Sequence, residues 1–208
     1  MKSIIFAVCR TDSGRFRSGF QLGQHRLPGD KRHPYEHDIR IPFVLRGPGV
    51  LQNHTVNSIA LSIDVAPTFT AIATGTVPDD MDGVSLLPLL GGKAAPKTWR
   101  KDFMVDYHGQ GRQPCGLVQC PAPPADDWHL IDGYNNTFTC VRTLGDGHAD
   151  TMYCEFADDV NFVEFYDHDV DPWQLRNRAT TAPSTTLEPL KKRLQALRTC
   201  KGKECRPL

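Results

Sequence analysis

One segment near the start of the chain concentrates side chains that could bind an anion. It runs from Gly19 to Glu36 and places His25, Lys31, Arg32 and His33 among glycines and prolines. Backbone N–H groups and cationic side chains converge readily in such a loop, because glycine has no Cβ atom to crowd them. The alternative is a solvated basic loop, which composition alone favours because charge clusters usually lie on protein surfaces.

The charge and composition of the whole chain exclude several classes of protein. Its 208 residues carry 24 Lys and Arg against 24 Asp and Glu, without the basic surplus that is typical of nucleic-acid binding. No stretch approaches the roughly 18 uncharged apolar residues of a transmembrane helix, so we expect neither a nucleic-acid partner nor a membrane span. The 39% of apolar residues suffices for a core, while 17 Gly and 16 Pro predict a loop-rich body.

The seven cysteines favour disulfides over a zinc site. They fall into the pairs Cys115 and Cys120, Cys140 and Cys154, and Cys200 and Cys205, with Cys9 left over. None of these pairs has the C-x-x-C spacing of a zinc ribbon. The connectivity stays open, apart from a local bridge that we predict between Cys200 and Cys205.

Two tripeptides match the acceptor pattern for N-glycosylation, at Asn53 and Asn135. Together with paired cysteines they favour an oxidising compartment, which is secretory, lysosomal or extracellular. The apolar run from Ile4 to Val8 is shorter than the roughly 7–15 residues of a signal peptide. We therefore expect residues 1–18 to be an atypical start of the chain and not a signal peptide.

Hydrophobic patterns in the first half predict two strands and two short helices. A β-branched apolar run at 39–45 predicts a buried strand. Residues 57–74 alternate first like a strand and then suggest a short helix that begins near Pro67. Residues 82–90 predict a second short helix before Gly91 and Gly92, and residues 91–98 a linker.

The second half predicts an antiparallel sheet followed by a helix. Short β-rich runs bounded by turn residues occur at 103–107, 137–141 and 161–166. At the end of the chain, leucines at 187, 190, 194 and 197 have the three- and four-residue spacing of a helix with one apolar face.

Several of these segments resemble the later half of a sulfatase catalytic domain, in the same order and over residues 19–208. The matching segments are Gly23-Gln24-His25 with Lys31, Asp38-Ile39-Arg40-Ile41-Pro42, Arg46-Gly47-Pro48-Gly49, Asp64 with Pro67-Thr68, Asp82-Gly83-Val84-Ser85-Leu86-Leu87-Pro88, and Tyr166-Asp167 with Asp171-Pro172 and Asn177. Within the family, the chain is most similar to the N-acetylglucosamine-6-sulfatases and the heparan endosulfatases.

The resemblance implies a partial alkaline-phosphatase-like α/β fold. Residues 19–92 would form the end of the large sheet domain, and residues 93–208 a C-terminal subdomain with an antiparallel sheet and a helix. Residues 1–18 match nothing in the family.

The resemblance also implies a function, namely hydrolysis of sulfate esters on sulfated amino sugars of glycosaminoglycans, in a lysosomal or secreted protein. Lys31 matches the lysine of the family that contacts sulfate, and His25 and His108 are further candidates for binding a sulfated glycan. Glu36, Asp38 and Arg40 are expected to form structural ion pairs. The acidic and amide side chains of the C-terminal signature, Asp167, Asp171 and Asn177, are expected to shape turns and caps and not to bind a metal.

Two parts of the family's chemistry have no counterpart in these residues. No cysteine is followed by the C-x-P-S-R or C-x-A-x-R pattern from which the formylglycine nucleophile is made. Where the family has S-D-N-G, with late ligands of calcium, this chain reads Phe16-Arg17-Ser18 before Gly19. We therefore expect no calcium to bind this chain and no catalytic residue within it. The alternative to a sulfatase is a non-catalytic sulfated-glycan-binding chain, or an unstable one.

Overall fold

The computed structural model describes residues 5–7, 19, 21–27, 31–92, 94–109, 136–144 and 149–206. They belong to two compact units, one drawn from residues 1–17, 42–102 and 195–208 and the other from residues 18–41 and 103–194. The domain boundary expected near residue 92 stays a prediction. Among the described residues, no helix combines the length and apolar character needed to cross a membrane.

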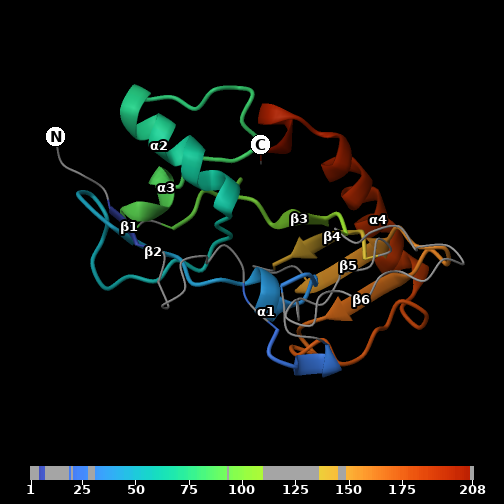
Figure 1. The fold of residues 1–208 in the computed structure, drawn as a ribbon. Coiled ribbons are helices and arrows are strands. Elements are labelled where there is room, and N and C mark those ends of the chain that lie inside the picture. Colours follow the sequence, from blue (N-terminus) through green and yellow to red (C-terminus); the bar gives the residue numbers. More distant parts are fainter. Residues whose placement is uncertain are drawn as a thin grey trace, which may run out of the picture. The chain divides into compact units, whose positions relative to one another are not determined.

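The first unit contains short elements joined by long connections (Figure 1). Strand β2 (Val44–Arg46) pairs antiparallel with β1 (Ile5–Ala7), and two further elements are helices α2 (Val65–Thr74) and α3 (Leu87–Leu90). The strand expected at 39–45 is therefore wrong in its extent, because Ile39 ends a helix and Pro42 has no N–H to donate to a ladder.

Asp64 is the buried centre of this unit. The strand expected just before it is also wrong, because residues 62–64 form the 3₁₀ helix η2 (Ser62–Asp64). The fully buried carboxylate of Asp64 accepts N–H bonds from Leu61 at 2.8 Å and from Val84 at 2.9 Å. Arg100 binds both carboxylate oxygens, at 2.7 and 3.1 Å. One side chain thus joins three segments that are distant in sequence.

The first unit also contains a small apolar core. Leu86, Leu89 and Trp99 are buried together, and Phe43 and Leu45 pack against them. The indole N–H of Trp99 donates to the carbonyl oxygen of Ile59 at 2.8 Å, so its polar group is satisfied inside the core. The segments 64–68 and 82–88, which resemble sulfatase segments, are therefore packing elements.

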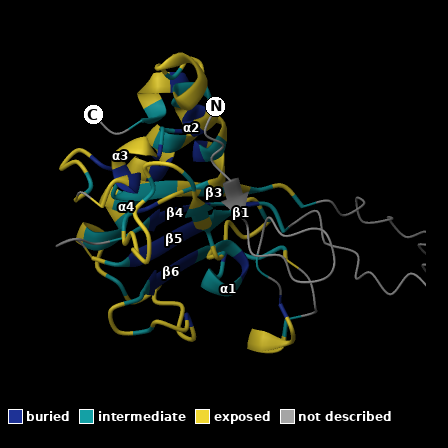
Figure 2. Ribbon diagram, turned by 90° about the vertical axis from the view of Figure 1, so that its left-hand side faces the viewer, coloured by how far each residue is buried: buried dark blue, intermediate teal, exposed yellow. Residues whose placement is uncertain are grey.

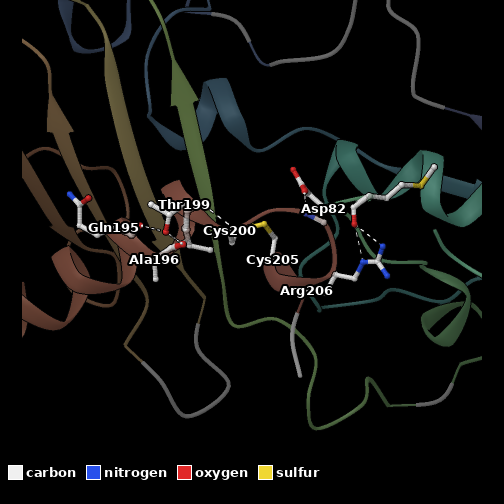
Figure 3. The surroundings of a disulfide bond; sticks show 10 residues. Asp82, Gln195, Ala196, Thr199, Cys200, Cys205 and Arg206 are labelled. Atoms are coloured by element: carbon white, nitrogen blue, oxygen red, sulfur yellow. Dashed lines mark hydrogen bonds between the residues drawn. A yellow bond between two sulfur atoms is a disulfide. The ribbon is translucent and has the colours of Figure 1, made fainter. Parts of the chain in front are cut away.

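A disulfide closes the C-terminal end of the chain (Figure 3). Helix α4 (Ser184–Thr199) ends just before Cys200, which is bridged to Cys205 at the end of the 3₁₀ helix η3 (Gly202–Cys205), as the close spacing of the two cysteines predicted. The leucines that predicted this helix are its less exposed positions, and Leu194 is fully buried.

The residues after α4, which belong to the first unit, are held by hydrogen bonds to residues 78–82 of the same unit. The N–H of Gly202 donates to the Asp82 carboxylate at 2.6 Å, and Arg206 Nε donates to the carbonyl oxygen of Met81 at 3.0 Å (Figure 3). No side chain other than hydrogen fits at Gly202, whose φ is 56° and whose added Cβ would lie 2.1 Å from the carbonyl oxygen of Asp79.

The second unit is built on a sheet of four strands in the order β3-β4-β5-β6. The strands are β3 (Asp102–Tyr107), β4 (Phe138–Thr143), β5 (Thr151–Phe156) and β6 (Val163–Asp167). The pairs β4–β5 and β5–β6 are antiparallel, as expected, although β5 was not foreseen. Figure 2 shows the central strands as the most buried part of this unit.

Cross-strand neighbours form the core of the sheet. Cys140 and Cys154 lie opposite each other in the β4–β5 register and are joined by a disulfide. Phe138 and Met152 complete the buried cluster, against which Ile39 packs from outside the sheet. Cys9, Cys115 and Cys120 lie outside the described residues.

Replacing Asp64 tests the packing of the first unit. Asp64→Asn removes the negative charge that neutralises Arg100, whose side chain is only 8% exposed. An uncompensated buried charge should lower the free energy of unfolding by about 3 kcal/mol, measured by urea denaturation. The control is Asp79→Asn, which breaks the exposed Lys203 pair and should change stability little. Equal effects of the two substitutions would contradict the role of Asp64.

Candidate functional site

The segment that carries the candidate anion-binding residues is anchored at its first glycine. The N–H of Gly19 donates to the carbonyl oxygen of Asp38 at 2.7 Å. A Cβ atom at this position would lie 1.6 Å from the carbonyl oxygen of His37, so a larger residue cannot make this close approach. The two ends of the segment, which is called the loop below, therefore meet.

Lys31 lies exposed directly before two residues whose backbone groups are held by side chains. The carbonyl oxygen of Arg32 accepts a bond from Asn136 Nδ2 at 2.9 Å, and the N–H of His33 donates to Asp38 Oδ2 at 3.0 Å. Burial raises the pKa of the Asp38 carboxyl group, although the bond from His33 opposes that rise. The backbone next to Lys31 is thus held by side chains of the same unit.

His25 lies in an aromatic stack near the other end of the loop. It belongs to the 3₁₀ helix η1 (Gln24–Arg26), which begins after Gly23 at a φ of 100°. Its ring stacks on Tyr35, with centroids 4.9 Å apart, and on His37, with centroids 5.1 Å apart. Partial burial and the neighbouring His37 lower the pKa of His25, whereas Asp171 opposes the shift, so the neutral imidazole is favoured more than in a free histidine.

A buried arginine binds the loop to the sheet. Arg142 of β4 is 2% exposed, and its Nε donates to Glu36 Oε1 at 2.7 Å. Its Nη1 donates to the Asp150 carboxylate and to the carbonyl oxygen of Thr151. Glu36 begins helix α1 (Glu36–Ile39), so this ion pair fixes the last turn of the loop.

A second polar contact joins Tyr35 to the last strand of the sheet. The Tyr35 hydroxyl donates to Glu164 Oε1 at 3.2 Å, and the ring of Tyr166 meets that of Tyr35 edge to face. Burial raises the pKa of Glu164, whereas the bonds from Tyr35 and Tyr166 lower it by less. The Glu164 carboxyl group therefore stays protonated to higher pH than an exposed one.

His108 is held beside the sheet by its own neighbour. Its Nε2 lies 3.1 Å from Asp106 Oδ2, and its side chain is 80% exposed. The next residue, Gly109, donates its N–H to Thr137 Oγ1 at 3.0 Å. Because Asn136 binds the carbonyl oxygen of Arg32, two consecutive residues connect the segments that carry His108 and Lys31.

The other predicted residues have simpler positions. Asn53 is exposed with a φ of 49°, and Asn135 lies outside the described residues. The Asp171 carboxylate and the Asn177 amide accept backbone N–H groups, as expected of turn formers. Glu36 makes the expected ion pair, although its principal partner is Arg142 and Arg40 lies 4.0 Å away.

Sequence reasoning missed the residues that support the loop from a distance. Arg142 and Gln174 both bind Glu36, across 106 and 138 positions of the chain. Gln21 is fully buried and its Oε1 pairs with His37 Nε2 at 3.1 Å. These residues are too far apart in the sequence for any local spacing to connect them. The one available signal for Arg142 is a charged residue within an otherwise uncharged strand.

The described residues do not fit the calcium that the resemblance implies for the family. Within them, no three side chains of His, Cys, Asp or Glu converge to hold a metal ion. The loop carboxylates already bind other groups, since Asp38 accepts from His33 and Glu36 from Arg142. We derive no step through calcium, and its expected absence from this chain stays a prediction.

The arrangement of this unit is shared with known proteins. The family described as "N-sulphoglucosamine sulphohydrolase, C-terminal" matches residues 23–152, which include most of the loop, residues 42–102 of the first unit and strands β3 and β4. The N-acetylglucosamine-6-sulfatases of Capra hircus and Homo sapiens are each 41% identical to this chain over 91% of its length. The chain spans about a third of the length of these curated relatives, 34% and 35%.

A solved structure supports the same fold. A protein in complex with its substrate D-glucosamine-2-N,6-O-disulfate superposes with a TM-score of 0.68 and 26% identity, over 90% of this chain and 33% of that one. The fold is therefore α/β and alkaline-phosphatase-like, with the antiparallel sheet and helices described above. Because the family match covers more than half of the chain, the protein belongs to the sulfatase family, in the part described as N-sulphoglucosamine sulphohydrolase, C-terminal.

Proposed function

We propose that this chain is the substrate-binding portion of a sulfatase that removes 6-O-sulfate from glucosamine residues of glycosaminoglycans. Its relatives at 40–41% identity are N-acetylglucosamine-6-sulfatases, and the solved neighbour binds a 6-O-sulfated glucosamine. The observation that carries the proposal is Lys31, an exposed cation whose two following residues, Arg32 and His33, are held through their backbone groups. A lysine on a fixed loop can neutralise a sulfate ester without first having to order its backbone.

The two histidines have separate roles in this proposal. The His25 ring is stacked and favours its neutral form, so it offers a flat face and one hydrogen-bond donor to a sugar hydroxyl. His108 is exposed, and the contact of its Nε2 with Asp106 orients the ring. Together with Lys31 they would bind a sulfated amino sugar, Lys31 at the sulfate and the histidines at the sugar.

The proposal places the nucleophile and the calcium outside the residues described here. No cysteine of the sequence has the pattern needed for formylglycine, and the described residues hold no cluster of metal ligands. The 208 residues by themselves should therefore bind a sulfated sugar without hydrolysing it. Bridged cysteines and the exposed Asn53 acceptor support a lysosomal or secreted, glycosylated protein.

Lys31→Ala tests the binding role. The dissociation constant of the chain for D-glucosamine-6-sulfate, followed by NMR shift titration, should rise about tenfold because a charge-assisted contact to sulfate is lost. Lys31→Arg should keep most of the affinity, and the exposed Lys97→Ala is the matched control that should leave it unchanged. An unchanged affinity in Lys31→Ala would remove the basis of the proposal.

Turnover by the isolated chain tests the other half of the proposal. With 4-methylumbelliferyl sulfate or glucosamine-6-sulfate, and with calcium added, we expect no hydrolysis above the buffer rate, because no group in the chain can serve as the sulfatase nucleophile. Calcium-dependent turnover comparable to that of a full-length relative would contradict this expectation.

The second candidate function is binding of sulfated glycans without catalysis. It is favoured by the way the loop is held, since Asn136, Asp38 and Arg142 fix it entirely within the second unit. In this candidate the protein binds the glycan without a nucleophile or calcium, whereas in the first candidate both are supplied by other residues. Absence of binding together with strong uptake of a hydrophobic dye would instead identify an unstable chain.

A further inference from the structure

The turn that follows β6 presents one face inward and the other to solvent. The Asp171 carboxylate closes it by accepting N–H bonds from Leu175 at 3.1 Å and from Arg176 at 2.8 Å. Gln174, at a φ of 55°, is 3% exposed and its Oε1 accepts the N–H of Glu36 at 2.9 Å. This inward contact fixes the orientation of the turn and directs its neighbours away from the core.

The outward face of the turn is unusually apolar. Trp173 is 74% exposed and Leu175 is 70% exposed, and Val170 just before the turn is 67% exposed. Figure 2 colours most of the chain after β6 as exposed. Tryptophan is seldom left in water to this extent, and an apolar group of this kind on a polar surface marks an interaction site.

A shallow hollow of about 430 Å³ is formed by the same turn and the residues that follow it. Its lining consists of Val170, Asp171, Arg176, Asn177, Arg178 and Thr181. Two of these side chains are guanidinium groups, and both belong to the short stretch that directly follows Trp173 and Leu175. The hollow is therefore lined by two guanidinium groups and by the Asp171 carboxylate, which accepts backbone N–H groups, and the exposed Trp173 lies close by in the sequence.

Arg176 is the cation in this hollow that is most available to a ligand, and Arg178 is partly exposed beside an acidic partner. Within the described part of the chain, the Arg176 side chain has no ion pair or hydrogen bond, and Arg178 Nη1 lies 3.6 Å from Asp167 Oδ2 with its side chain 45% exposed. By contrast, the Asn177 amide is occupied, since it accepts from Phe165 and donates to Val163. Guanidinium groups bind sulfate and carboxylate groups through paired N–H donors.

We propose that residues 170–181 form a second, non-catalytic binding surface for an acidic, sulfated glycan chain. Trp173 packs against the face of one sugar ring, and Arg176 and Arg178 bind the sulfate or carboxylate groups of its neighbours. The Arg176 guanidinium selects this occupant over an apolar protein segment, which would leave this charge unpaired in the interface. The choice of ligand rests on the proposed function, whereas the surface itself does not involve Lys31.

The test uses the full 208-residue chain and a heparin-derived octasaccharide, with binding measured by isothermal titration. Trp173→Ala should weaken binding on the order of tenfold and Arg176→Gln about fivefold, because a stacking contact and a charge-assisted contact are lost. Trp173→Phe should restore most of the affinity. Lys192→Gln, which removes one exposed positive charge elsewhere in the second unit, should have little effect.

Two further measurements keep this test separate from the test of Lys31. The octasaccharide should still bind Lys31→Ala, and D-glucosamine-6-sulfate should bind Trp173→Ala as tightly as it binds the unaltered chain. Octasaccharide binding that is insensitive to Trp173 and Arg176 would overturn the second surface, whatever the outcome at Lys31. The proposal would also be overturned if Trp173→Ala only abolished self-association of the chain, seen by sedimentation, because the ring would then serve a protein contact.

Discussion

The candidate site depends on the ion pair between the buried guanidinium of Arg142 and Glu36. Helix α1 has only four residues and cannot be stable by itself, because so short a helix gains too few hydrogen bonds to offset its nucleation. Its first residue, Glu36, is held by Arg142 from the centre of the sheet. The same guanidinium binds Asp150 and the Thr151 carbonyl, so one charge satisfies both the loop and the β4–β5 connection.

Gln174 connects the turn after β6 both to the loop and to the core of the sheet. Gln174 accepts the N–H of Glu36 and donates to the sulfur of Met152, which belongs to the core of the sheet. Its inward position is what leaves Trp173 facing solvent. The residue that fixes the last turn of the Lys31 loop therefore also fixes the exposed surface proposed to bind a glycan. Both surfaces therefore belong to the second unit and are connected through Gln174 to the core of its sheet.

Local patterns predicted the strands and the helix better than the polar supports. The leucine spacing predicted α4, and β-rich runs predicted β3, β4 and β6, because these elements bury apolar side chains at regular intervals. Strand β5 was not predicted, because it lacks the usual alternation of apolar and polar residues. Its first four residues are all buried, namely Thr151, Met152, Tyr153 and Cys154. The strand expected at 39–45 failed where the ion pair of Glu36 stabilises a helix instead. Lys31 is a candidate only through the motif in which it stands, since an exposed lysine has no signature of its own, and its role stays a prediction.

Hydrogen exchange in Arg142→Met tests directly whether this arginine holds the candidate site in place. The amide of Asp38, bonded to the Tyr35 carbonyl, and that of Arg40, bonded to the Glu36 carbonyl, report on the last turn of the loop. If Arg142 holds the loop, these amides should exchange about tenfold faster or more in the variant, while the β5–β6 amides keep their protection. Unchanged exchange at Asp38 and Arg40, with the substitution accommodated in the sheet, would contradict this account.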